Sequence, residues 1–331
     1  MPHVTWVFPK AHNPPAFMTT KVLIVDIHAE QYRDRLRDAF PALQFTLFHS
    51  AKEVTGDLSD IDVMLMFGIE VRDFMLAGAP RLKWMQSLAT GVDHFLRCPS
   101  LKPNVLITSG RGIHGPPMRE QVVYMMMAIS RDAVRAVGDQ KAHFWERRLW
   151  STLHGKTAAI AGTGVVGGAI GELLKALGMH VIGVTREPRA APGFDEMIAT
   201  DRLADAARRA DYLINMLPAS ENNIGIFDAG IFAAMKPSAY YISAGRGQTV
   251  DEAALLAVLR ERRIAGAALE VFQTEPLPAD SPFWDLPNVF ITPHIGGYVV
   301  EYEDFIMPLI VDNMRLFLAG RPGEMRNIVV R

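Results

Sequence analysis

The sequence predicts an α/β protein with two doubly wound parallel sheets. Short runs rich in β-branched residues alternate with longer helical patterns along most of the 331 residues, which is typical of parallel sheets covered by helices. The strands fall into two successive series, and a glycine-rich turn directly follows the first strand of the second series. A chain of 331 residues also favours two domains over one hydrophobic core.

Each candidate strand is a short apolar run bounded by turn residues. The first series comprises Val22–Asp26, Phe45–Phe48, Val63–Phe67, Lys83–Ser87 and Val105–Thr108. The second series makes a complete doubly wound unit. Its members are Thr157–Ala161, His180–Val184, Tyr212–Asn215, Tyr240–Ser243, Ala265–Leu269 and Val289–Ile291.

Two breaks divide the chain into domains. Gly115-Pro116-Pro117 interrupts the first series and opens an apolar helix from about Met118, since proline is favoured in a first helical turn. A last helical pattern over about 301–319 follows the final strand and can return to the first domain. We therefore expect a discontinuous first domain of residues 19–117 and 298–331, a second domain of residues 118–297, and a tail of residues 1–18.

Composition and charge favour a cytoplasmic protein that acts on small molecules. The formal net charge is −2 without a long run of Lys or Arg, so we expect neither nucleic acid nor a membrane surface as a partner. No apolar run approaches the roughly 20 residues that cross a bilayer. Cys98 is the only cysteine, which excludes an internal disulfide and favours a reducing compartment. No metal site is predicted.

A dinucleotide-binding pattern, Gly162-Thr163-Gly164-Val165-Val166-Gly167, joins the strand Thr157–Ala161 to a helical pattern that runs to about Leu177. The first glycine permits a tight turn, the second lets the backbone approach a pyrophosphate, and the third allows close packing of helix on strand. The helix N-terminus then faces the negative charge. Glycines in an ordinary strand–helix turn are the alternative, but the βαβ context favours binding of NAD or NADP.

The choice between these cofactors depends on the end of the next strand, where an acidic residue would bind the ribose 2′-hydroxyl of NAD. Thr185 and Arg186 stand there instead, and a guanidinium matches the geometry of a 2′-phosphate. Glu187 follows directly and opposes this interpretation, and an exposed loop arginine is the simpler alternative. We expect NADP to be preferred, with NAD possible.

Three side chains suited to keto-acid chemistry follow the last three strands. Arg246, Glu275 and His294 come after the fourth, fifth and sixth strands of the second series, and the carboxyl ends of parallel strands are where such sheets bind ligands. Reduction of a ketone needs a proton from a group that titrates near neutrality, which favours histidine. A carboxylate at Glu275 would favour the imidazolium form, and Arg246 can bind a carboxylate in a bidentate way.

Motifs in the same order resemble the D-2-hydroxyacid dehydrogenase family over nearly the whole chain after Met18. Besides the glycine pattern they are Ser87-Leu88-Ala89-Thr90-Gly91-Val92-Asp93, Arg246-Gly247, Ala268-Leu269-Glu270-Val271-Phe272, Glu275-Pro276-Leu277-Pro278 and Pro293-His294-Ile295-Gly296-Gly297. The resemblance implies a flavodoxin-like substrate domain and a Rossmann dinucleotide-binding domain. It implies that Arg246 grips the substrate carboxylate and carbonyl, His294 is the acid/base, and Glu275 pairs with it. The backbone of Ala89, Thr90, Gly91 and Val92 would cap the substrate carboxylate.

The resemblance also implies further cofactor contacts and a homodimer. Besides the glycine pattern, Thr185 and Arg186, the expected cofactor residues are Leu217, Pro218, Ala244, Glu270 and Gly296. Glu270 departs from the family, which usually has Asp near the nicotinamide, and Ser243 and Asn223 depart from its usual Asn and Thr. Trp145 and Trp150 fall where the family has dimer contacts, although burial within the monomer explains them equally well.

The predicted activity is reduction of a small 2-keto acid, such as glyoxylate or hydroxypyruvate, to the D-2-hydroxy acid with NADPH or NADH. The alternative enzyme activity is NAD-dependent oxidation of a 2-hydroxy acid. A dinucleotide-sensing binding protein of the corepressor type is an alternative from another class. The presence of Arg246, Glu275 and His294 together favours catalysis over binding alone.

Overall fold

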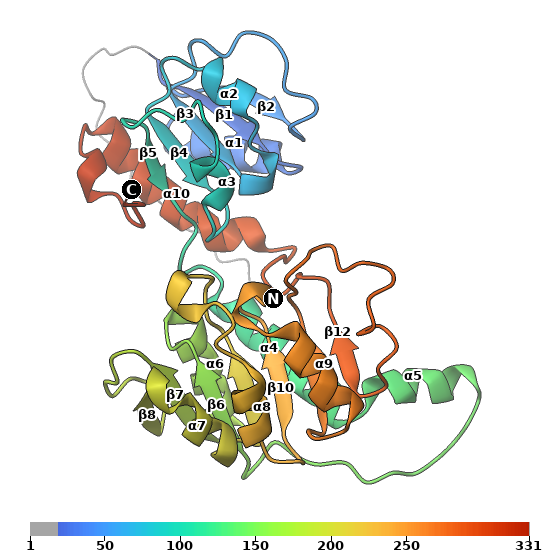
Figure 1. Cartoon of the computed structure of the whole chain (residues 1–331). Helices are drawn as coiled ribbons and strands as arrows, with labels where there is room; N and C mark the ends of the chain where they lie inside the picture. The colour runs from blue at the N-terminus through green and yellow to red at the C-terminus, as the bar shows by residue number, and fades with distance from the viewer. Residues whose placement is uncertain (1–18, 331) are drawn as a thin grey trace. The chain divides into compact units, whose positions relative to one another are not determined.

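The computed structural model describes residues 19–330, which form two compact α/β units (Figure 1). Of the described residues, 19–113 and 300–330 form the first unit, and His114–Val299 form the second. Each unit has its own parallel sheet, so the predicted fold class is confirmed. The tail predicted for residues 1–18 lies outside the described residues.

The described part of the first unit has a five-stranded sheet in the order β2-β1-β3-β4-β5, the flavodoxin-like order. Its strands are β1 (Lys21–Val25), β2 (Gln44–Phe48), β3 (Val63–Met66), β4 (Trp84–Ser87) and β5 (Leu106–Thr108). Its helices are α1 (Ala29–Ala39), α2 (Asp73–Ala77), α3 (Asp93–Leu96) and α10 (Tyr302–Leu318). The strands lie within one residue of their predicted bounds, and the central strands β1, β3 and β4 are buried runs between turns, whereas the edge strand β2 is only partly buried.

The C-terminal helix α10 packs on the sheet of the first unit. Its Phe317 contacts the fully buried ring of Trp84 on β4, with 5.4 Å between the ring centroids. The indole N–H of Trp84 donates to Thr108 Oγ1 at 2.8 Å, so this large side chain is buried with its polar atom satisfied. The chain therefore returns to the first unit after its last strand.

The described part of the second unit has a seven-stranded sheet in the order β12-β11-β10-β9-β6-β7-β8. Its strands are β6 (Thr157–Ala161), β7 (His180–Thr185), β8 (Glu196–Ala199), β9 (Tyr212–Asn215), β10 (Tyr240–Ser243), β11 (Gly266–Leu269) and β12 (Val289–Ile291). Its helices are α4 (Gly115–Ser130), α5 (Ala133–Lys141), α6 (Val165–Ala176), α7 (Leu203–Arg209), α8 (Ala229–Ala234) and α9 (Glu252–Arg260). The edge strand β8 and helix α5 were not predicted.

Helices cover both faces of this sheet. Apolar residues of α4 and α6 form one core cluster with the strands, and those of α7, α8 and α9 form the other. Burial on both faces explains why the strands are almost continuously apolar instead of alternating. The strands β10, β11 and β12 are neighbours, and their last residues Ser243, Leu269 and Ile291 lie level in register. The segments that follow these strands therefore start side by side at one edge of the sheet.

Helix α5 and the segment that follows it form an arm, residues 133–152, that extends away from the sheet (Figure 1). The helix has no buried residue, and Trp145 is 91% exposed. Burial within the monomer therefore does not explain Trp145. Trp150 is 56% exposed and stacks on the guanidinium of Arg131, 4.0 Å from the ring centroid.

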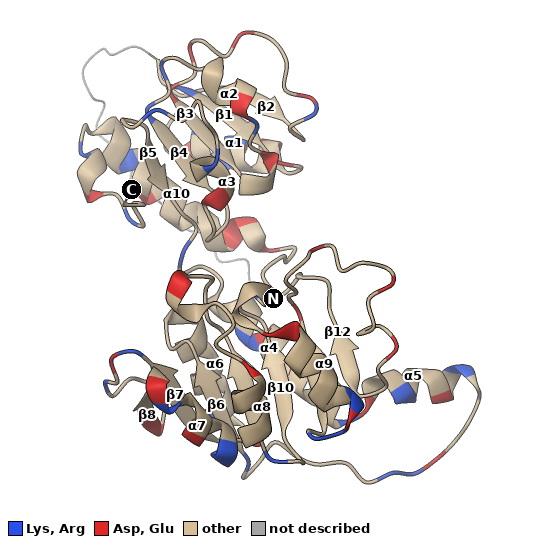
Figure 2. Ribbon diagram, in the orientation of Figure 1, with Lys and Arg blue, Asp and Glu red and all other residues tan. Residues whose placement is uncertain are grey.

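Charged residues of both signs are interspersed along the ribbon of each unit (Figure 2). Among residues 19–330, no helix combines the length and the apolar character that a membrane span needs.

Candidate active site

Arg246, Glu275 and His294 lie in the segments that follow β10, β11 and β12 in the second unit. Because these strands are neighbours, the three segments meet at the carboxyl edge of the sheet. A cation, a carboxylate and an imidazole are therefore collected at one edge.

His294 and Glu275 form a direct hydrogen bond, with 2.6 Å between Nδ1 and Glu275 Oε2. The other carboxylate oxygen, Oε1, accepts the backbone N–H of Phe272 at 2.9 Å. Burial by itself raises the pKa of Glu275, but the hydrogen bonds from His294 and Phe272 and the charges of His294 and Arg246 outweigh it and hold this pKa below its ordinary value. Glu275 is therefore ionised at neutral pH and fixes the orientation of the imidazole.

The ring nitrogen Nε2 of His294 is the one left for a ligand. It has no partner in the described part of the chain, and the side chain is 45% exposed. The backbone of His294 adopts a left-handed conformation with φ of 54°, which is uncommon for a residue other than glycine. Its N–H donates to the carbonyls of Glu270 at 3.0 Å and Thr292 at 3.1 Å, and these bonds hold the conformation. The imidazole is thus presented on a constrained loop.

The backbone position of Arg246 is fixed because the next residue, Gly247, packs closely on the backbone of Phe272. A Cβ at Gly247 would lie 1.9 Å from the carbonyl carbon of Phe272, so this position accepts only glycine. The guanidinium donates to the Gly245 carbonyl at 2.8 Å, and its charge acts on both Glu275 and His114. Burial, and then the Arg246 charge, lower the pKa of His114 to about 4, so His114 is neutral at pH 7. Sequence reasoning gave His114 no role.

The glycine-rich turn between β6 and α6 fits a dinucleotide. Gly162 has φ of 101°, and a Cβ there would lie 2.8 Å from the Met216 carbonyl oxygen. A Cβ at Gly167 would lie 2.0 Å from the Gly162 carbonyl oxygen, which explains the close contact between helix and turn. Gly164, by contrast, has no atom within 4 Å of its Cβ position, and no side chain caps the N-terminus of α6. The turn therefore leaves its backbone open at the position where a pyrophosphate would bind in a turn of this kind.

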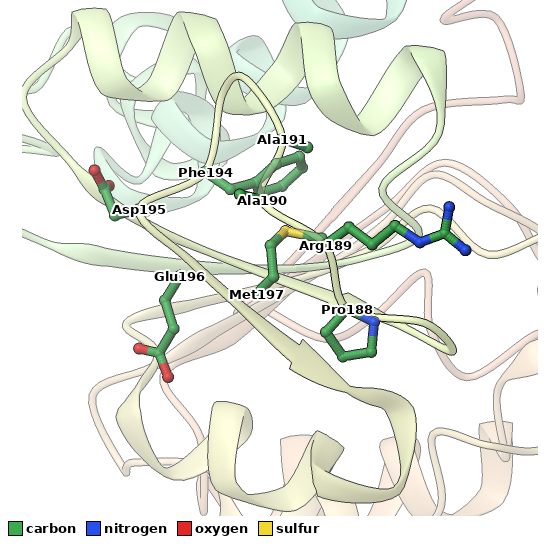
Figure 3. Close-up of a pocket in the computed structure, with 8 residues that line it drawn as sticks. All are labelled: Pro188, Arg189, Ala190, Ala191, Phe194, Asp195, Glu196 and Met197. Carbon is green, nitrogen blue, oxygen red and sulfur yellow. The ribbon is translucent and has the colours of Figure 1, made fainter.

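Thr185 ends β7 and is partly buried, whereas Arg186 is exposed in the following loop. Arg189 pairs with Glu187 at 2.6 Å, and both side chains are mostly exposed. The same loop and β8 line an open surface hollow of about 280 Å³. In Figure 3 the Arg189 guanidinium lies on one side of this hollow, and the Asp195 and Glu196 carboxylates lie on the other. The residues that line it are Pro188, Arg189, Ala190, Ala191, Phe194, Asp195, Glu196 and Met197.

Three further predicted cofactor residues, Leu217, Pro218 and Ala244, lie after β9 and β10. The Leu217 N–H donates to Asn215 Oδ1 at 3.1 Å, and Asn223 Nδ2 donates to the Pro218 carbonyl at 2.9 Å. Ala244 is buried directly after β10. Ser220 Oγ, in the same loop after β9, is buried and has no hydrogen-bond partner within residues 19–330. Asn223 thus supports the loop through its amide.

Glu270, the first residue after β11, is 2% exposed, and both of its oxygens are hydrogen-bonded. Gly296 N–H donates to Oε1 at 2.5 Å, while Gln121 Nε2 and the Thr292 hydroxyl donate to Oε2, the former at 2.8 Å. Sequence reasoning missed Gln121. Gln121 follows two charged residues, Arg119 and Glu120, and directly precedes the apolar run of α4, so no local pattern distinguishes it from an ordinary polar residue near the start of a helix.

The predicted carboxylate-capping residues Ala89–Val92 follow β4 in the first unit. The Ser87 hydroxyl donates to the Ala89 carbonyl at 2.9 Å and accepts the Ala89 N–H at 3.1 Å. Gly110 N–H also donates to the Ala89 carbonyl at 2.8 Å. Hydrogen bonds within this unit therefore define the shape of the loop.

Residues 123–296 match the family model described as D-isomer specific 2-hydroxyacid dehydrogenase, NAD binding domain. D-3-phosphoglycerate dehydrogenase of Mycobacterium leprae is 31% identical over 250 residues, which are 74% of this chain and 47% of that protein. The chain thus spans about half the length of the phosphoglycerate dehydrogenases that it matches. Glyoxylate/hydroxypyruvate reductase B of Pectobacterium atrosepticum is 31% identical over 293 residues, 87% of this chain and 88% of that one.

A solved structure supports the same relationship over both units. The NADPH-dependent glyoxylate/hydroxypyruvate reductase of Sinorhizobium meliloti, in complex with NADP and sulfate, superimposes with a TM-score of 0.79 at 29% identity. The match covers 94% of this chain and 98% of that one. The glycine turn, the strand order and these matches agree, and the chain belongs to the D-isomer specific 2-hydroxyacid dehydrogenase family.

Proposed function

We propose that this protein reduces a small 2-keto acid, of the glyoxylate or hydroxypyruvate kind, to the D-2-hydroxy acid. The observation that carries the proposal is the 2.6 Å hydrogen bond between His294 and Glu275 at the sheet edge that also carries Arg246. An acid/base oriented by a carboxylate beside a fixed cation suits the reduction of a carbonyl next to a carboxylate. The similarity to two glyoxylate/hydroxypyruvate reductases supports the substrate class.

The residues divide the chemistry between binding and proton transfer. A bound reduced nicotinamide supplies the hydride that becomes the new C–H bond of the alcohol. His294 gives the Nε2 proton to the carbonyl oxygen, so that hydride and proton together make the hydroxyl product. Glu275 stabilises the imidazolium that donates this proton. Arg246 binds the substrate carboxylate and polarises the carbonyl. We extend the proposal to the Ala89–Val92 backbone as a second carboxylate-binding group.

The proposed cofactor is NADPH, with NADH as a weaker substitute. Thr185 has no charge to repel a 2′-phosphate, and Arg186 is exposed beside it. Changing Thr185 to Asp and Arg186 to Gln together should move the ratio of kcat/KM for NADPH and NADH towards NADH, because one change adds repulsion and the other removes attraction. Arg189→Gln is the matched control, since Arg189 already pairs with Glu187. A wild-type enzyme equally specific for NADH would contradict the preference.

We propose that a second copy of this chain covers the arm of residues 133–152, as expected for a homodimer. The side chains of Phe144, Trp145 and Leu149 in this arm are all more than half exposed. A group of large exposed apolar side chains is typical of a protein–protein interface. A two-fold dimer lets each arm bury its apolar side chains on the partner. Sedimentation should give twice the chain mass of 36.7 kDa for wild type and for Ile69→Glu, an exposed apolar site in the first unit. Trp145→Glu with Leu149→Glu should give monomers, and an unchanged dimer would refute this interface.

A panel of small 2-keto acids and 2-hydroxy acids tests the proposed activity. Initial rates with NADPH, NADH, NADP and NAD separate the keto-acid reductase from the NAD-dependent 2-hydroxyacid dehydrogenase. The reductase is supported by the highest kcat/KM for a two- or three-carbon keto acid with NADPH. Dinucleotide binding without turnover of any acid would instead support a sensor of the corepressor type.

A further inference from the structure

The buried residue Glu270 forms several hydrogen bonds with the loop that carries His294. The loop comprises Thr292–Gly297 and follows β12, and Glu270 follows the neighbouring strand β11. Thr292 precedes His294 in the loop, and its hydroxyl donates a hydrogen bond to Glu270 Oε2. Gly296 follows His294, and its N–H donates to Glu270 Oε1 at 2.5 Å. The backbone carbonyl of Glu270 accepts the N–H of His294 itself at 3.0 Å. Glu270 therefore binds the loop before, at and after the imidazole.

Gln121 on α4 completes this network. Its Nε2 donates to Glu270 Oε2 at 2.8 Å and to Thr292 Oγ1 at 3.0 Å, so the three side chains form a closed triangle of hydrogen bonds. The loop also packs tightly on this part of α4, because a Cβ at Gly296 would lie 2.7 Å from Gln121 Cγ. Helix, strand end and loop are thus joined at one point.

We propose that Glu270 and Gln121 are positioning residues that hold the His294 loop in its active conformation. The proposal rests on the proposed function, in which His294 transfers the proton. It gives Glu270 a role beyond the sequence-based expectation that it serves the cofactor, because three donors from the protein itself bind its two oxygens. The loop needs such support, since the left-handed backbone of His294 is strained for a residue with a Cβ.

The network can be inverted without losing a hydrogen bond. In the exchange variant Gln121→Glu with Glu270→Gln, the amide at 270 donates to the carboxylate at 121 and to Thr292. The Thr292 hydroxyl turns to donate to position 121, and Gly296 N–H still donates to the side-chain oxygen at 270. In Gln121→Glu alone, two buried carboxylates face each other and repel. In Glu270→Gln alone, the Gln121 amide can turn to accept, so a smaller effect is expected.

The test compares these three variants with wild type and with Glu120→Gln, which changes an exposed carboxylate on the same helix. We expect Gln121→Glu to lower kcat by roughly 10–100-fold through misplacement of the imidazole, with KM for NADPH unchanged. The exchange variant should recover most of this loss, and Glu120→Gln should match wild type. Hydrogen exchange of the Gly296 amide should speed up in Gln121→Glu and slow again in the exchange variant.

Three results would overturn the proposal. The first is a folded Gln121→Glu variant with the kcat and the Gly296 amide protection of wild type. The second is an exchange variant whose kcat stays as low as that of Gln121→Glu. The third is a raised KM for NADPH in Glu270→Gln with Gly296 protection intact, since this would assign Glu270 to the cofactor. If Gln121→Glu does not fold, Gln121→Met takes its place, because it removes the donor without adding charge. Gly296 exchange is measured without turnover, so it tests the network even if His294 proves not to be the proton donor.

Discussion

Glu275→Gln is the substitution that most directly probes the electrostatics of the candidate active site. Glu275 accepts two hydrogen bonds, from His294 Nδ1 at 2.6 Å and from the Phe272 N–H at 2.9 Å. Glutamine has the same shape but only one acceptor oxygen, so its amide must face one of these two donors. If the amide faces His294, the imidazole must keep its proton on Nε2 in the neutral form, which is a poor acid. If it faces Phe272, that backbone N–H loses its partner.

The expected loss follows from the geometry of the pair. A charge-assisted hydrogen bond contributes about 1.5–3 kcal/mol. We halve this because the His294 and Glu275 side chains are 45% and 36% exposed to screening water. At about 1.4 kcal/mol per factor of ten, the remainder corresponds to roughly 3- to 12-fold, and the donor mismatch adds to it. We therefore expect kcat/KM for keto-acid reduction to fall at least roughly tenfold.

The assay follows the absorbance of the reduced cofactor with saturating NADPH and varied keto acid. Glu261→Gln, at an exposed site in the same unit, is the control for loss of a carboxylate and should match wild type. Because the folded-state pKa of Glu275 lies below the ordinary 4.5, its stabilisation is present above pH 4.5 and lost as the pH falls through that lower pKa. The difference in unfolding free energy between wild type and Glu275→Gln should shrink in that range. A folded variant with wild-type kcat/KM would refute the reasoning.

Three further substitutions test separate parts of the second unit. His114→Gln should flatten the acid side of the stability profile, because the pKa of His114 is about 4 in the folded protein and its ordinary value is 6.5. Wild type therefore loses stability as the pH falls from 6.5 to 4, and in chemical denaturation the variant should lose up to about 2–3 kcal/mol less over this range. An identical profile would contradict this. Gly167→Ala should lower stability by at least about 1–3 kcal/mol and weaken dinucleotide binding in calorimetry, because the new Cβ would lie 2.0 Å from the Gly162 carbonyl oxygen; unchanged binding would count against the glycine turn. Arg246→Lys should raise KM for the keto acid and lower kcat together, since an ammonium cannot make the bidentate contact, and unaltered steady-state kinetics would remove Arg246 from the substrate site.

Buried strands were the most predictable part of the fold. Runs such as Val63–Met66 and Tyr212–Asn215 are wholly buried, so their apolar character stands out from the flanking turns. The edge strand β8 was missed because Glu196–Ala199 is short, only partly buried, and follows a loop with two prolines and a glycine. Helix α5 was missed because it is only nine residues long and only two residues separate it from the end of α4, so its pattern was not separated from that of the longer helix.

Residues of the candidate site were predictable where the chain makes them follow strands directly. Arg246 and His294 lie within three residues of the ends of β10 and β12, so the parallel sheet alone directs them to one edge. Gln121 comes from a helix more than a hundred residues earlier in the sequence and meets Glu270 only through packing of α4 on the sheet. Periodicity cannot reveal such a contact, because it records which face of an element is apolar and not which polar atoms meet across elements.

The most direct test of the central claim is the turnover of His294→Ala with NADPH and a small keto acid, alongside its affinity for NADPH. Nε2 of His294 is the proposed proton donor, whereas the glycine turn that fits the dinucleotide lies between β6 and α6. We therefore expect kcat to fall by roughly 10²–10⁴-fold while the Kd for NADPH stays close to that of wild type. A folded His294→Ala enzyme that reduces the keto acid at near the wild-type rate would contradict the assignment of His294 as the acid/base.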